Sequence, residues 1–98
     1  MEVYVNIKRR GRHVLLAICD ANLLGKTLTD GDITFTIHKE FYSGLKVSAD
    51  EAVNLINQST IVNMVGEKIV SRAIERGFVH PQAVLTVSGV PHAQIVKM

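Results

Sequence analysis

Two groups of residues in this sequence could do chemistry, and the first is basic. The run "KRRGRH" begins at Lys8 and brings Lys8, Arg9, Arg10 and Arg12 together around one glycine. Arginine forks match phosphate oxygens, and neutralising a phosphate backbone releases its condensed counterions. We therefore expect an RNA- or anion-binding surface here, with Lys26 extending it. The same pattern also occurs in solvated turns that keep sheet edges from pairing, and this second interpretation stays open.

The second group is polar and lies in the C-terminal half of the chain. Asn63 and Glu67 are four residues apart, which places them on one side of a helix, and His92 and Gln94 share one face of an extended segment. A histidine acts as acid or base near neutral pH when a carboxylate orients it. A polar catalytic site is therefore one hypothesis, and it requires His92 within hydrogen-bond reach of Glu67 in a cleft. The alternative is that His92 anchors the last strand.

Other kinds of chemistry are disfavoured. "LLGKT" resembles the end of a phosphate-binding loop, but Asp20 stands where that motif needs its first glycine, and no long helix follows. The four histidines have no helical spacing that would converge on a metal ion, and the single cysteine, Cys19, is expected to be a buried, inert thiol. We expect no metal and no cofactor, and no residue is assigned a catalytic role.

The composition is that of a globular protein. The chain has 98 residues, of which 47% are hydrophobic and 20% charged, and its formal net charge is +2. We expect a single domain over residues 1–98. A lone cysteine fits a reducing cytoplasm, and the acidic start lacks the features of an export signal. The longest apolar run, "VLLAI", is far shorter than the roughly 20 residues of a membrane-spanning helix. The expected protein is soluble and cytoplasmic, without a membrane partner.

These side chains must be positioned by strands and helices, which the hydrophobic periodicity predicts. Alternation predicts strands over 3–8 and 13–20, joined as a hairpin, and a third over 33–39 with Ile33, Phe35 and Ile37 inward. The segment between the second and third strands is expected to be irregular or a single helical turn. Further strands are expected over 84–87 and from there to the C-terminus.

Two helices are expected between these strands. Ser48 with Glu51 three residues later is a capping box that begins the first helix. The second is expected over 60–77, with Gly66 in its interior. The predicted fold is α+β, a small antiparallel sheet of about four to five strands packed on a two-helix layer.

Four motifs in this order, "LLGKT", "FYSG", "STIVNMVGEKIV" and "GVPHAQ", resemble the uncharacterised archaeal family catalogued as domain of unknown function 424. The resemblance covers almost the whole chain, although the "KRRGRH" tip is more basic than expected of the family. The residues that match the motifs are Gly25, Lys26, Asn63, Gly66, Glu67, Pro91, His92 and Gln94.

The family has no assigned activity or cofactor. The resemblance implies that the gene for this protein lies near genes of translation. The favoured hypothesis is a cytoplasmic, non-enzymatic binding module whose partner is ribosomal or transfer RNA or a translation factor. The enzyme with a polar site is the alternative, and a structural, oligomer-forming protein is the second alternative, since exposed strand edges at the termini could pair between chains. The oligomeric state is left open.

Overall fold

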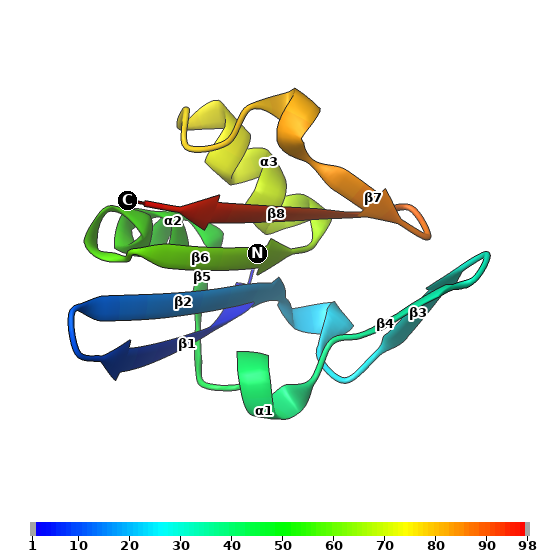
Figure 1. Ribbon diagram of the computed structural model, residues 1–98, viewed down its shortest axis with the longest axis horizontal. Coiled ribbons are helices and arrows are strands. Elements are labelled where there is room, and N and C mark those ends of the chain that lie inside the picture. The colour runs from blue at the N-terminus through cyan, green and yellow to red at the C-terminus, as the bar shows by residue number, and fades with distance from the viewer. Residues whose placement is uncertain (1, 98) are drawn as a thin grey trace.

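A computed structural model describes residues 2–97, and Figure 1 shows how its elements are arranged. This described part of the chain contains eight strands and three α-helices. The strands are β1 (Glu2–Arg10), β2 (His13–Asp20), β3 (Thr27–Asp30), β4 (Ile33–Thr36), β5 (Leu45–Ser48), β6 (Ile61–Val65), β7 (Leu85–Val87) and β8 (Val90–Val96). The helices are α1 (Lys39–Tyr42), α2 (Ala49–Asn54) and α3 (Glu67–Glu75), and 3₁₀ turns cover Ala21–Leu23, Leu55–Gln58 and Pro81–Ala83.

The main sheet is larger than predicted and is mixed. Within residues 2–97 it contains six strands in the order β5-β1-β2-β6-β8-β7. The predicted β1–β2 hairpin is confirmed, and β2, apolar on both faces, lies centrally. All neighbouring strands are antiparallel except β2 and β6, which are parallel. The α+β class is therefore confirmed, whereas a wholly antiparallel sheet of four to five strands is wrong.

The predicted helix over 60–77 is wrong in its first third. Residues 61–65 form strand β6, and only Glu67–Glu75 are helical. Gly66 separates the two with φ +125°, a conformation that side-chain-bearing residues rarely adopt. The apolar spacing of "IVNMV" fits a helix stripe and a doubly buried strand equally well, and pairing with β2 and β8 selects the strand. Gly66 is thus a boundary and not an interior residue.

A second, two-stranded sheet follows β2 and had been predicted only in part. Its strand β4 was expected, but β3 was expected to be irregular. The single helical turn that was the alternative for this segment covers Ala21–Leu23. Ile37 is fully buried as predicted, while Ile33 is 59% exposed, because the β3–β4 hairpin leaves the main sheet. Figure 1 shows this hairpin reaching toward the turn between β7 and β8, where the backbone amide of Ser88 donates to Asp30 at 3.0 Å.

The C-terminal strand β8 follows β6 and precedes β7 in the strand order, but its two neighbours overlap only at His92. Strand β7 pairs with residues 90–92 and β6 with residues 92–96, so within residues 2–97 most of β8 has a neighbouring strand on one side only. The expected exposed edge at the C-terminal strand is therefore present, and its pairing between chains stays a prediction. Pro91 is tolerated because β6 has ended beside it: the last pair of that ladder is Val65 with His92. The carbonyl of Pro91 accepts instead from the amide of Gly66 at 2.9 Å.

The sheet has apolar clusters on both faces. On one face, α2 and α3 pack against the side chains that include Leu16, Ile18 and Val62. On the other, Ala17, Cys19 and Val65 are covered by residues from the segments between β2 and β5, including Leu23, Ile37 and Tyr42. We call this second face the groove face. It is covered only near the carboxyl ends of β2 and β6, because Lys8, His13 and Gln94 at its other end are exposed.

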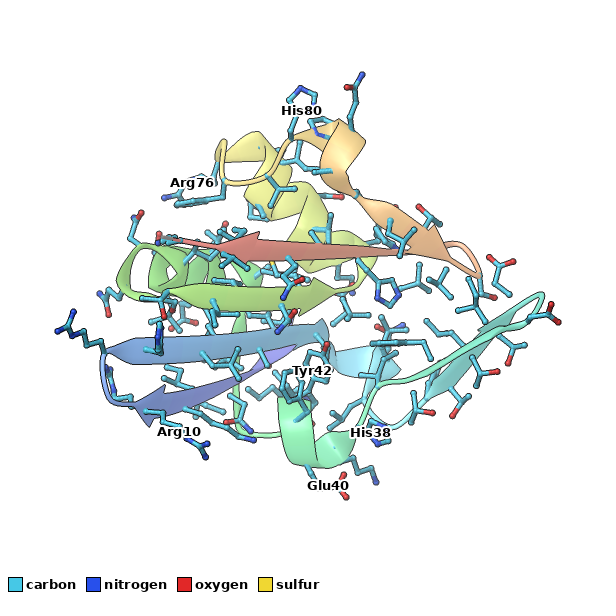
Figure 2. The ribbon with its side chains drawn as sticks, in the orientation of Figure 1. Arg10, His38, Glu40, Tyr42, Arg76 and His80 are labelled. Atoms are coloured by element: carbon cyan, nitrogen blue, oxygen red, sulfur yellow. The ribbon has the colours of Figure 1, made fainter. Side chains whose placement is uncertain are left out.

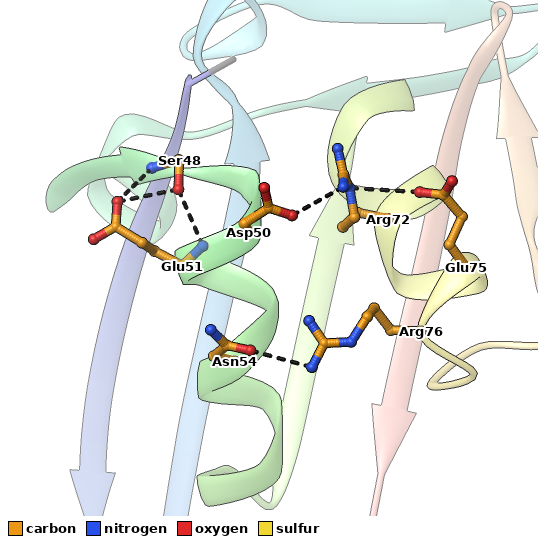
Figure 3. Close-up of polar contacts among 7 residues, drawn as sticks. All are labelled: Ser48, Asp50, Glu51, Asn54, Arg72, Glu75 and Arg76. Carbon is orange, nitrogen blue, oxygen red and sulfur yellow. Dashed lines mark hydrogen bonds and ion pairs between the residues drawn. The ribbon is translucent and has the colours of Figure 1, made fainter.

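On the opposite face, polar contacts stabilise the start of α2 and join α2 to α3 (Figure 3). The predicted capping box is present: the amide of Glu51 donates to Ser48 Oγ, and the amide of Ser48 donates to Glu51 Oε1, both at 3.1 Å. Arg72 of α3 pairs with Asp50 of α2 at 2.9 Å. One turn further along, Arg76 donates to Asn54 at 3.2 Å, so the two helices are held in register.

Candidate binding groove

An open groove of about 450 Å³ lies on the groove face, between the main sheet and the segment from β4 to α1. Its sheet side is formed mainly by β6 and β8, and its outer wall by Phe35 of β4 and Phe41 of α1. Figure 2 shows Tyr42 on the side of α1 that meets the sheet and Glu40 on the side away from it. The polar side chains among its lining residues are Thr36, His38, Tyr42, Asn63, His92 and Gln94.

Three of the four residues predicted to form a polar site meet in this groove. Asn63 of β6 lies directly opposite Gln94 of β8, and His92 lies opposite Val65. Directly opposed antiparallel residues have their Cβ atoms roughly 5 Å apart and their side chains on one face. His92 and Gln94 therefore share a face, as the extended pattern indicated, and Asn63 joins them from the neighbouring strand.

His92 is held against Phe35 in an edge-to-face contact, with ring centroids 4.7 Å apart and an interplanar angle of 84°. Burial lowers the pKa of His92, because the charged imidazolium loses solvation in the groove. The ring is thus neutral at physiological pH. Its Nε2 atom is buried and has no hydrogen-bond partner among residues 2–97.

Glu67 does not belong to this constellation. Glu67 is the first residue of α3, whereas Asn63 lies in strand β6. The two residues do not share a helix, so the expected i, i+4 pair is wrong. Glu67 lines a different cavity, beside Asp20, Lys68 and Pro91. No carboxylate lines the groove within the described residues, so the enzyme hypothesis loses the group that was to orient His92.

The basic hairpin is continuous with the groove through its single lysine, Lys8. In the β1–β2 register, Lys8 pairs with Leu15 and Arg10 with His13, which places all four on the groove face. The Nζ atom of Lys8 lies 5.6 Å from the ring centre of Phe41, which also lines the groove. Such a contact between an ammonium group and an aromatic ring is attractive.

The remaining basic residues of the predicted surface lie elsewhere. By strand alternation Arg9 projects from the opposite face of the sheet, and Arg12 is in the turn. Lys26 follows the carboxyl end of β2. A strand of 8 residues is about 26 Å long, and this separates its carboxyl end from the β1–β2 turn. Figure 1 shows the β1–β2 turn at one end of the sheet and the segment after β2 at the other. Lys26 therefore does not extend the hairpin surface.

The outer wall of the groove was not predicted. Phe35 and His38 were placed in the predicted strand over 33–39, and Phe41 was assigned to no element, because nothing local shows that the β3–β4 hairpin and α1 turn back over β6 and β8. The indication available was the run "FYSG", in which two adjacent aromatic residues follow a strand. Phe41 and Tyr42 are in fact packed edge to face, with centroids 4.9 Å apart.

Cys19 is fully buried beneath the groove, and burial raises its pKa to about 12, so it remains a protonated thiol at neutral pH. In the part of the chain from 2 to 97, no three His, Cys, Asp or Glu side chains come close enough to hold a metal ion. None of the helices in this range is long and apolar enough to cross a membrane.

Fold and groove together define a small α+β protein in which a mixed sheet carries two helices on one face and an aromatic groove on the other. The chain belongs to the family described as a protein of unknown function (DUF424), whose model matches residues 7–98. A solved structure, that of an uncharacterised conserved protein from Methanopyrus kandleri, is similar over 100% of this chain and 95% of its own. The identity is 30% and the TM-score 0.84. The archaeal source of that structure agrees with the archaeal character of the family. No protein with a curated description matches the sequence.

Proposed function

We propose that this protein is a non-enzymatic binding module that holds single-stranded RNA on the groove face. The observation that carries the proposal is the contact of Lys8 with Phe41 at 5.6 Å. It joins the basic end of the groove face, with Lys8 and Arg10, to the aromatic wall of the groove in one surface.

The chemistry of this surface suits a single strand. Lysine and arginine bind backbone phosphates, and aromatic rings stack on bases, which is how proteins commonly hold single-stranded nucleic acid. A groove of about 450 Å³ has room for an unpaired base but not for a duplex. Among residues 2–97, no carboxylate lines the groove to repel the phosphates. Unpaired bases are also the usual target of sequence-specific RNA recognition, and unpaired segments of ribosomal or transfer RNA are the proposed partner.

Fluorescence anisotropy with labelled oligonucleotides tests the proposal. Affinity for a ten-residue single-stranded RNA is measured from about 25 to about 200 mM salt, with DNA of equal sequence in parallel. The variant Lys8→Ala/Arg10→Ala removes two charges from the groove face. Its matched control, Arg9→Ala/Arg12→Ala, removes the same charge from outside that face.

We expect the first variant to lower the slope of log K against log salt by roughly 1.4, the equivalent of two phosphate contacts. The control should change the slope by less than half as much. The proposal is wrong if no RNA binds at the lowest salt, or if both variants weaken binding equally. Equal affinity for the DNA would contradict its RNA part.

A further inference from the structure

The groove contains a polar atom that the fold leaves without a partner. His92 Nε2 is buried and makes no hydrogen bond within residues 2–97. A buried nitrogen of this kind is destabilising unless something bonds to it, and such atoms are uncommon in folded proteins. The edge-to-face contact with Phe35 keeps the ring in this orientation. A neutral imidazole offers either a donor or an acceptor at Nε2, depending on its tautomer.

Two neutral amides line the same groove as His92. Asn63 and Gln94 are opposed in the β6–β8 ladder, and both line the groove, Asn63 half-buried and Gln94 exposed. Each amide presents a carbonyl acceptor and an NH₂ donor from one flat group. The sheet side of the groove therefore carries donors and acceptors but no formal charge.

The opposite wall is aromatic. Phe35 of β4 and Phe41 of α1 line it, and Phe35 also packs on His92 of the sheet at one end. The space of about 450 Å³ lies within the range of small-molecule sites, which is about 300 to 1,000 Å³. A flat ligand with a polar edge fits between such walls, since its face can pack on the rings and its edge can meet the amides.

We infer that the groove is a base-binding pocket, in which Phe35 and Phe41 pack on one unpaired nucleobase while Asn63, Gln94 and His92 hydrogen-bond to its edge. The inference rests on the proposed function, and it specifies which part of the bound single-stranded RNA enters the groove. Adenine is the expected base, because a side-chain amide matches the N6 donor and N7 acceptor of adenine, whereas guanine prefers the two donors of an arginine. His92 Nε2 is closed to solvent and Phe35 packs on the ring, so the base reaches this atom only when Phe35 moves from the imidazole onto the base.

The test compares ten-residue oligo(A) with oligo(U) and oligo(C) at one salt concentration. Wild-type protein is expected to bind oligo(A) about tenfold more tightly, the discrimination of one bidentate amide–base pair. The variant Asn63→Ala/Gln94→Ala should lose this preference and keep the salt slope of the wild type. Asn57→Ala/Gln58→Ala is the matched control: it removes one Asn and one Gln that are exposed and do not line the groove, and it should keep the preference.

The outcomes separate the base pocket from the proposed function. If every oligonucleotide binds equally, or if the Asn63/Gln94 variant keeps the preference, the base pocket is wrong and RNA binding stands. If no oligonucleotide binds, the proposed function is wrong, and adenosine monophosphate is titrated while ¹⁵N-labelled protein is followed by NMR. Shifts of the Asn63 and Gln94 side-chain amides and of the His92 ring then support the pocket. Their constancy overturns it.

Discussion

Gly66 lies so close to Asp20 that a Cβ atom added to Gly66 would stand 2.3 Å from the carboxyl carbon of Asp20. Asp20 is the last residue of β2, and Gly66 joins β6 to α3. The carboxylate of Asp20 accepts from the backbone amides of Lys68 at 2.9 Å and Ile69 at 3.1 Å. The end of one parallel strand thus caps the helix that follows its neighbour, and only a glycine leaves room for the capping group.

Gly66→Ala is expected to destabilise the protein by about 3 kcal/mol, because a side chain here meets both the carboxyl group and a strained backbone at φ +125°. The free energy of unfolding is measured by chemical denaturation. Gly77→Ala is the control: its φ is also positive, at +79°, but a Cβ there meets nothing within 4 Å, so a loss of about 1 kcal/mol is expected. Equal losses in both variants would show that the contact with Asp20 does not matter.

Asp20→Ala is expected to cost about 2 to 3 kcal/mol, since it leaves the first amides of α3 without their acceptor. Burial raises the pKa of Asp20, so part of what these hydrogen bonds contribute is offset by the burial of the charge. Asp20→Asn keeps one acceptor oxygen and avoids the burial of a charge. Its stability should therefore lie between that of the wild type and that of Asp20→Ala. Denaturation midpoints of the three proteins check the order, and an asparagine variant less stable than the alanine variant would contradict it.

The two polar contacts of α2 should differ in strength. Ser48→Ala removes the hydroxyl that accepts from the backbone amide of Glu51, and it should destabilise the protein by about 1 kcal/mol. Asp50→Ala breaks the ion pair with Arg72. Because the side chain of Asp50 is 67% exposed and that of Arg72 30% exposed, the loss should be less than about 0.5 kcal/mol. Both are measured by thermal unfolding. A larger effect for Asp50→Ala would mean that the ion pair, not the cap, holds α2.

His92 should make stability depend on pH. Because burial lowers its pKa, the unfolded chain binds a proton here more readily than the folded protein does. The stabilising contribution of neutral His92 is complete above the ordinary histidine pKa of 6.5 and declines as the pH falls through 6.5 toward the lower folded value. His92→Asn cannot titrate, so it should lose less stability than wild type between about pH 7.5 and 5. Parallel pH profiles of the two proteins, from thermal unfolding, would contradict this, and the exposed His13→Asn serves as the control.

Local patterns predicted those elements whose formation depends on neighbours in the chain. The β1–β2 hairpin follows from strand alternation on either side of one short turn, and the Ser48–Glu51 box involves residues only three apart. For the same reason His92 and Gln94 were correctly placed on one strand face. Such contacts need no knowledge of the rest of the fold.

The sequence by itself determined the α+β class, the basic hairpin and the polar face of the last strand, because short-range periodicity and capping decide them. Only the tertiary structure decided that β6 is a strand, since its apolar spacing suits a helix until parallel pairing with β2 supplies its hydrogen bonds. That pairing separates Glu67 from Asn63, and β6 pairs in turn with β8. It also brings Asn63 to His92 and Gln94 under the aromatic wall, across separations along the chain that no local pattern encodes.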